Sequence, residues 1–221
     1  PSRDLKEVLR SASLWRTRTE GAFDPTVQRM WEAAAAGLDP TDDLIKTAGT
    51  EITVAEDRIG IEQGTALTLN GIAQGHIADR VSEILLHHGF GDAVINTGEL
   101  RLLGGHRRAV GIPAAKAAVS VAEVAIATSE PKSLIFDPKG RRHHLIDPRT
   151  GESPRYWQSI SVFAHKAQTA DALSTAFAVL PFDAVADLSA TIGDNAVIGR
   201  DRKGRIRRFG DPMLTGGTRV S

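Results

Sequence analysis

The sequence predicts an α+β protein in which helices cover a mainly antiparallel sheet. Helical periodicity marks the start of the chain and two later stretches, and the remainder consists of short runs of strand-forming residues. Turn signals separate these runs, and the clearest is the DPKG segment at 137–140, which predicts a hairpin turn. Within its 221 residues the chain shows no internal repeat and no low-complexity linker, so no domain boundary is expected.

Helices are expected where apolar residues recur every three or four positions. The first has an apolar face running from Leu5 to Trp15, and the second ends at Gly37. The third follows a turn at 39–41, and the fourth ends at Gly89. The fifth must stop before a proline at position 181. In chain order the helices are expected at residues 4–18, 27–36, 42–47, 71–88, 169–180 and 183–192.

Strands are expected in the short runs rich in β-branched and apolar residues between these helices. In chain order they are expected at residues 52–54, 58–61, 66–69, 93–96, 100–103, 109–112, 119–127, 134–136, 143–146, 159–164, 196–198 and 205–209. Most neighbouring strands follow each other after short turns, which favours antiparallel pairing.

The composition excludes several classes of function. Lys+Arg and Asp+Glu both number 27, so the formal charge is 0 and a global basic field for nucleic acid is excluded. The basic run at 200–208 has no interleaved aromatic residues before its end and is expected to form a charged edge strand. Cysteine is absent, which excludes disulfides, thiolate metal sites and a cysteine nucleophile. No apolar run approaches the ~18 residues of a membrane span.

Two loops have the composition of ligand-binding segments. In GAFDPT at 21–26, Phe23 can stack on a flat ring and Asp24 can accept a hydrogen bond from a ligand; a helix–helix turn with Phe23 in the core and Asp24 as a cap is the alternative. In NGIAQGH at 70–76, small residues before a helix let backbone N–H groups approach phosphate oxygens, and a plain tight turn is the alternative. Its glycine spacing fits neither a Walker loop nor a dinucleotide fingerprint.

Two further segments carry groups suited to proton transfer and metal binding. HHLIDPRTG at 143–151 places a histidine before a rigid turn, where it can act as a general base, although a solvated histidine pair is the alternative. In ADALSTA at 170–176, Asp171 and Thr175 are four positions apart and therefore share a helix face. A carboxylate and a hydroxyl suit Mg²⁺, with substrate phosphate oxygens completing its shell. A helix cap at Asp171 and back-bonding by Thr175 are the alternative.

Five segments, in this order, resemble the ApbE-type family of FAD:protein FMN transferases. They read GAFDPT at 21–26, LTLNGIAQGH at 67–76, INTGEL at 95–100, HLIDPRTG at 144–151 and ADALST at 170–175. The resemblance spans nearly the whole chain and implies an ApbE-like fold. It also implies Mg²⁺-dependent transfer of FMN from FAD to a Thr hydroxyl of a client flavoprotein, with release of AMP.

The resemblance implies roles for particular residues. The FAD site is implied for Ala22, Phe23, Asp24, Asn70, His76 and Leu145. The Mg²⁺ site is implied for the backbone carbonyl of Ala73 and the side chains of Asp171 and Thr175. His144 matches the family's general base, which a Thr hydroxyl needs because it is a poor nucleophile.

Departures from the family pattern leave two other functions open. Thr68 stands where the family has Asp, Asn70 where it has Gly, and Gln74 where it has Lys. The alternatives are a Mg²⁺-dependent FAD pyrophosphatase, in which water replaces the client hydroxyl, and a non-catalytic flavin-binding protein on the same scaffold.

The resemblance also bears on domain organisation and location. It predicts one ApbE-like domain over residues 1–221. Family members usually carry an extra N-terminal region with a strand and flavin contacts, so the N-terminal part of the family domain is expected to be missing. The start at Pro1, the absence of cysteine and the family's common role on exported redox proteins predict a periplasmic or exported location.

Overall fold

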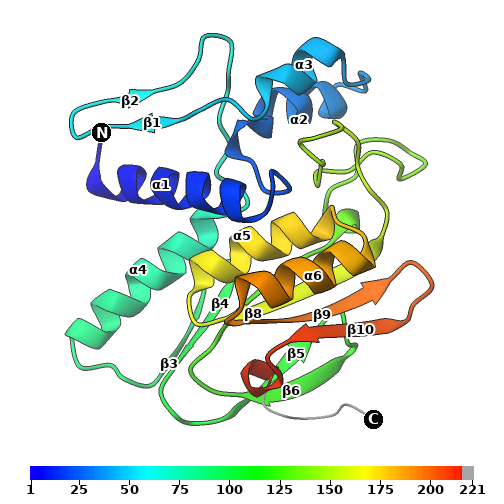
Figure 1. Cartoon of the computed structure of the whole chain (residues 1–221). Helices are drawn as coiled ribbons and strands as arrows, with labels where there is room; N and C mark the ends of the chain where they lie inside the picture. The colour runs from blue at the N-terminus through cyan, green and yellow to red at the C-terminus, as the bar shows by residue number, and fades with distance from the viewer. Residues whose placement is uncertain (216–221) are drawn as a thin grey trace.

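A six-stranded sheet forms the centre of the computed structural model, which describes residues 1–215; residues 216–221 of the expected domain lie outside the described part (Figure 1). The strand order is β10-β9-β8-β7-β4-β3, and every neighbouring pair is antiparallel. The strands are β3 (Ala93–Asn96), β4 (Leu100–Leu103), β7 (Ala125–Ser129), β8 (Trp157–Ala164), β9 (Asn195–Asp201) and β10 (Ile206–Gly210). This architecture confirms the predicted fold class.

Helices cover one face of this sheet. The helix α5 (Ala167–Ala178) packs on β7 and β8, and α6 (Phe182–Ile192) packs on β9 and β10. Two more helices, α1 (Arg3–Arg18) and α4 (Ala73–His87), lie against α5 (Figure 1). Because α5 lies between the sheet and these helices, its residues are buried on nearly all sides, including Leu173 and Phe177. This explains why α5 is apolar around most of its circumference.

A two-stranded ribbon covers the opposite face. It pairs β5 (Arg108–Ile112) with β6 (Ala117–Val121), and its inward residues Ile112 and Val119 join a second core with Phe163 and Ile198 of the sheet. The remaining elements flank α1: the helices α2 (Gln28–Ala35) and α3 (Asp42–Thr47) and the short pair β1 (Thr53–Val54) and β2 (Ile59–Gly60). Short 3₁₀ turns occur at Pro25–Val27, Pro131–Ser133 and Pro212–Thr215.

All six expected helices are present, with ends within two residues of the prediction. The expected strand at 66–69 is wrong: this stretch is irregular, and Thr68 N–H donates to the carbonyl of Pro25 rather than to a strand (2.8 Å). The expected strand at 119–127 is two strands, β6 and β7, because Glu123 lies in the left-handed region (φ 47°) and redirects the chain.

The expected hairpin around DPKG is present in part. The turn forms, with Gly140 N–H donating to the carbonyl of Asp137 (2.9 Å). However, the flanking residues make only one β-bridge, between Ile135 and His143, so the expected strands at 134–136 and 143–146 do not form. Among the described residues no helix is both long and apolar enough to cross a membrane.

Candidate active site

A pocket of about 300 Å³ lies where the start of α4 meets α5. Segments around residues 128–134 and 144–146, which lie between these two helices in the sequence, complete its lining. The sequence-predicted residues that line this pocket are Asn70, His144, Leu145, Asp171 and Thr175. Three of the four candidate segments, far apart in sequence, therefore meet at one site.

Two glycines let the start of α4 approach α5 closely. A Cβ atom on Gly71 would lie 2.7 Å from Thr175 Oγ1, and one on Gly75 would lie 2.3 Å from the backbone oxygen of Ala167. This contact brings the Gly75 N–H to Asp171, where it donates to Oδ2 (3.0 Å). The small residues of the 70–76 segment therefore serve helix packing, and that packing positions the Asp171 carboxylate.

Asp171 shares the pocket with a second carboxylate, Glu99, whose part in the site the sequence analysis missed. Burial, together with the nearby Glu99, raises the pKa of Asp171 to about 8, although the Gly75 N–H acts in the opposite direction. Burial also raises the pKa of Glu99 to about 7, against a hydrogen bond from the backbone of Thr128. The signal that could have found Glu99 is a carboxylate directly after Gly98 in the INTGEL segment.

The chemistry of this donor set fits a hard cation. Asp171 is 3% exposed, and a buried carboxylate beside a second one favours a bound proton or cation. Within residues 1–215, no group of three or more His, Cys, Asp or Glu could hold a metal ion. A cation at Asp171 would need further oxygen ligands, and the Thr175 hydroxyl, backbone oxygens and ligand oxygens are of the kind that Mg²⁺ takes. Ala73, the residue implied to give a carbonyl, is the first residue of α4.

His144 is held in a form suited to accepting a proton. Its Nδ1 lies 3.3 Å from the carbonyl oxygen of Leu134, and since a carbonyl only accepts, Nδ1 carries the hydrogen and Nε2 has the free lone pair. Burial lowers the pKa of His144, against that hydrogen bond, so the ring is neutral near pH 7. The adjacent Leu145 is buried and lines the same pocket.

The other predicted residues lie outside the residues that line this pocket. Ala22 and Phe23 belong to the main core. Asp24 accepts hydrogen bonds from the N–H and hydroxyl of Thr26 (2.8 and 2.6 Å) and pairs with Arg16 (3.1 Å), as in the capping alternative.

His76 is also turned away from the pocket. Its Nδ1 accepts from Gln168 Nε2 (3.1 Å), and its Nε2 lies 3.9 Å from Asp4 of α1. In this structure, then, the flavin roles implied for the 22–24 loop and for His76 have no geometric counterpart in the pocket, and those assignments stay predictions.

Solved structures share this fold. The ApbE protein from Thermotoga maritima matches with a TM-score of 0.84 and 25% identity, over 97% of this chain and 78% of its own. The apo form of the Pseudomonas stutzeri flavinyl transferase ApbE matches with a TM-score of 0.81 and 23% identity, over 99% and 77% of the two chains. The fold is therefore that of the ApbE flavin transferase structures. The ApbE family model matches residues 1–198, and the chain belongs to the ApbE family.

Two curated relatives carry the same name, FAD:protein FMN transferase. The protein from Treponema pallidum (strain Nichols) is 30% identical over 223 aligned positions, which cover 82% of this chain and 61% of the relative. The protein from Rhodobacter capsulatus is 29% identical over 221 positions, covering 88% and 42%. The chain thus spans about half of the length of these relatives.

Proposed function

We propose that this protein transfers FMN from FAD to a Thr hydroxyl of a client flavoprotein and releases AMP, with Mg²⁺ bound at Asp171. The observation that carries the proposal is the buried Asp171 carboxylate, which shares one pocket with the Thr175 hydroxyl and with a neutral histidine, His144. The names of the two curated relatives support the transfer of FMN from FAD to a protein.

His144 has the chemistry of the base in this reaction. Its Nε2 takes the proton of the acceptor Thr hydroxyl as that oxygen attacks the FMN phosphorus of FAD. The new bond joins the Thr oxygen to this phosphorus, and the bond from the phosphorus to the bridging oxygen of the pyrophosphate breaks. AMP leaves with the bonding electron pair. The fixed Nδ1–H···O bond to Leu134 keeps the ring in the tautomer that this step needs.

Asp171, Thr175 and the carbonyl of Ala73 would hold the metal ion. When bound, Mg²⁺ would supply positive charge that offsets the charge of the FAD pyrophosphate. Asp171 supplies the negative charge for binding, and the Gly75 N–H fixes one of its oxygens so that the other is available. Leu145, buried beside His144, offers an apolar contact to the flavin end of the ligand.

The His144→Ala variant tests this assignment. We expect it to bind FAD and Mg²⁺ like the wild type and to lose ~10²–10⁴-fold in the rate of FMN transfer, because only the base is removed. The measurement is the mass of a candidate client flavoprotein after incubation with FAD and Mg²⁺, together with AMP release. His106→Ala, which changes an exposed histidine outside the pocket, is the matched control. Transfer by His144→Ala at the wild-type rate would show that His144 is not the base.

The same assay separates the alternatives. Release of AMP and FMN by the wild type without modification of any client would favour the FAD pyrophosphatase. No turnover of FAD under any condition would favour a flavin-binding protein. Asn70 and Gln74, which depart from the family pattern and line the pocket, would then be the first residues to test as the cause of the lost activity.

We also propose a periplasmic or exported location. The support is the implied role of the family on exported redox proteins and a cysteine-free sequence, which suits an oxidising compartment. Fractionation of cells that express the native gene is expected to recover the protein outside the cytoplasm, and recovery in the cytoplasm would contradict the proposal.

A further inference from the structure

Two hollows lie next to the candidate active site, behind one of its walls. One has a volume of about 540 Å³ and the other of about 260 Å³, and they share Arg155, Trp157 and Arg202. The two hollows adjoin at these shared residues, and their lining extends from Lys132 to the β9–β10 turn at Lys203. We call this depression, with Lys132, Arg155, Trp157, Arg202 and Lys203, the basic groove.

The groove is lined by cationic side chains from separate parts of the chain. In the part of the chain that the structure describes, the side chains of Lys132, Arg155, Arg202 and Lys203 form no ion pair, and all four are exposed.

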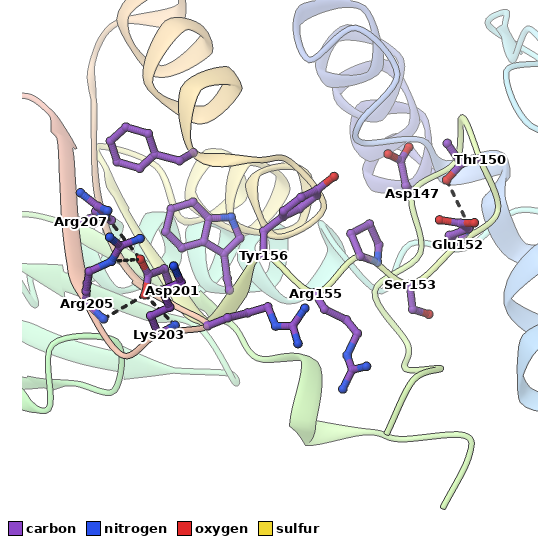
Figure 2. A pocket seen from close by; sticks show the side chains of 14 residues that line it. Asp147, Thr150, Glu152, Ser153, Arg155, Tyr156, Asp201, Lys203, Arg205 and Arg207 are labelled. Carbon is purple, nitrogen blue, oxygen red and sulfur yellow. Dashed lines mark hydrogen bonds and ion pairs between the residues drawn. The ribbon is translucent and has the colours of Figure 1, made fainter. Parts of the chain in front are cut away.

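Two of the acids that line the groove are already paired. Asp201 lies against Arg205 (2.7 Å), and Asp147 accepts from Arg149 (2.7 Å). Figure 2 shows the Asp201 cluster at one end of the larger hollow, Asp147 and Glu152 at the other, and Arg155 between them. Glu152 is the remaining lining carboxylate, so the middle of the groove presents unpaired cations.

The wall between the groove and the active site is thin. Consecutive residues face opposite sides of it: His143 lines the groove and His144 lines the active-site pocket, with ring centroids 6.5 Å apart. Likewise Ile135 lines the groove and Leu134 the pocket, and each is 45% exposed. A macromolecule that presents a hydroxyl to His144 therefore comes next to this wall, whose other side lines the groove.

We propose that the basic groove binds an acidic stretch of the client protein beside its acceptor residue. This inference rests on the proposed transfer to a protein hydroxyl, since that reaction brings a second protein next to the wall. The unpaired cations supply charge complementarity for Asp and Glu side chains. The exposed Leu134, Ile135 and Tyr156 supply the apolar contacts that a protein partner uses and a small anion does not.

A binding assay without FAD or Mg²⁺ tests the groove alone. The probe is a fluorescein-labelled octaglutamate peptide, followed by fluorescence anisotropy at low ionic strength. The test variant is the triple substitution Arg155→Glu, Arg202→Glu and Lys203→Glu. The matched control is Arg3→Glu, Arg58→Glu and Lys116→Glu, which reverses three exposed cations away from the groove. Both triple variants change the net charge equally, and urea unfolding of each checks that it is folded.

We expect the wild type and the control to bind octaglutamate within about twofold of each other and the groove variant to bind about tenfold more weakly. Equal binding by all three proteins would overturn the proposal. Equal weakening in both triple variants would also overturn it, because net charge alone would then explain the effect. Complete displacement of the peptide from the wild type by millimolar phosphate or AMP would show a small-anion site and overturn it as well.

A second measurement connects the groove to the reaction. With a client that the wild type modifies, the groove variant is expected to raise the KM for the client about tenfold and to leave kcat and the KM for FAD as in the control. An unchanged KM for the client would overturn the proposal. If the wild type modifies no client at all, the transferase proposal fails while the peptide assay still decides whether the groove binds acidic chains.

Discussion

Replacing Asp171 with Asn tests the electrostatics of the pocket without any ligand. Asp171 is 3% exposed, and its carboxylate accepts a hydrogen bond from the Gly75 N–H, which an Asn side-chain oxygen can also accept. The pKa of Asp171 is raised to about 8 in the folded protein, from a value of 3.8 for the free side chain. Proton binding by this carboxyl therefore favours the folded state, and its stabilising contribution is complete below pH ~3.8 and lost as the pH rises through ~8.

The size of the effect follows from this shift. Each pKa unit corresponds to about 1.4 kcal/mol, so a shift from 3.8 to about 8 sets a ceiling of about 6 kcal/mol on the cost of ionising Asp171 in the folded state. Water entering the pocket screens part of this cost. We therefore expect the free energy of unfolding of the metal-free Asp171→Asn variant to exceed that of the wild type by about 3 kcal/mol at pH 8. At pH 5 we expect this difference to be about 2 kcal/mol smaller.

Urea unfolding in EDTA between pH 5 and pH 8, followed by tryptophan fluorescence, measures this gap. Asp43→Asn, at an exposed side chain in α3, controls for the change in net charge. A gap that is the same at pH 5 and pH 8, or a variant less stable than the wild type at pH 8, would refute the argument from burial. Addition of Mg²⁺ at pH 8 should raise the stability of the wild type and leave that of the variant unchanged.

Three substitutions test the packing that shapes the site, each measured by urea unfolding. Gly75→Ala should destabilise the fold by about 3 kcal/mol or more, because its Cβ would meet the backbone of Ala167 at 2.3 Å, and wild-type stability would mean that α4 can move away freely. Gly199→Ala should cost about 1–3 kcal/mol, because its Cβ would lie 2.5 Å from the Trp157 ring; an unchanged midpoint would disprove this contact. Phe177→Ala, in the fully buried face of α5, should cost about 3–5 kcal/mol, and a loss below 1 kcal/mol would contradict its place in the core.

The sequence predicted the fold best where local structure depends on residues that are close together in the chain. The helix around Thr175 and the turn at Gly140 follow from apolar spacing and turn residues, and both form as expected. The 119–127 stretch reads as one strand because its apolar character is continuous. Its division at Glu123 depends on two different partners, β5 for the first half and β4 with β8 for the second, which local pattern does not encode.

The site shows the same limit. The spacing of Asp171 and Thr175 predicted a shared helix face, and the resemblance of the motifs predicted that His144 belongs to the same site; all three line one pocket. Glu99 was missed because its role depends on its burial and on its nearness to Asp171, which is 72 positions away in the sequence. The residues next to Glu99 in the sequence indicate neither. The turn of His76 toward Asp4 likewise depends on how α1 packs against α4.

The contact between Gly75 and Asp171 joins residues 96 positions apart, and this separation has a kinetic consequence. Closing so large a loop costs entropy before any bond rewards it, so we expect this contact to form late in folding. A pocket assembled late is absent from much of the folding transition state. Ligands that occupy it should therefore slow unfolding while leaving the rate of folding nearly constant. The lifetime of the folded chain would then depend on the supply of any ligand that fills this pocket.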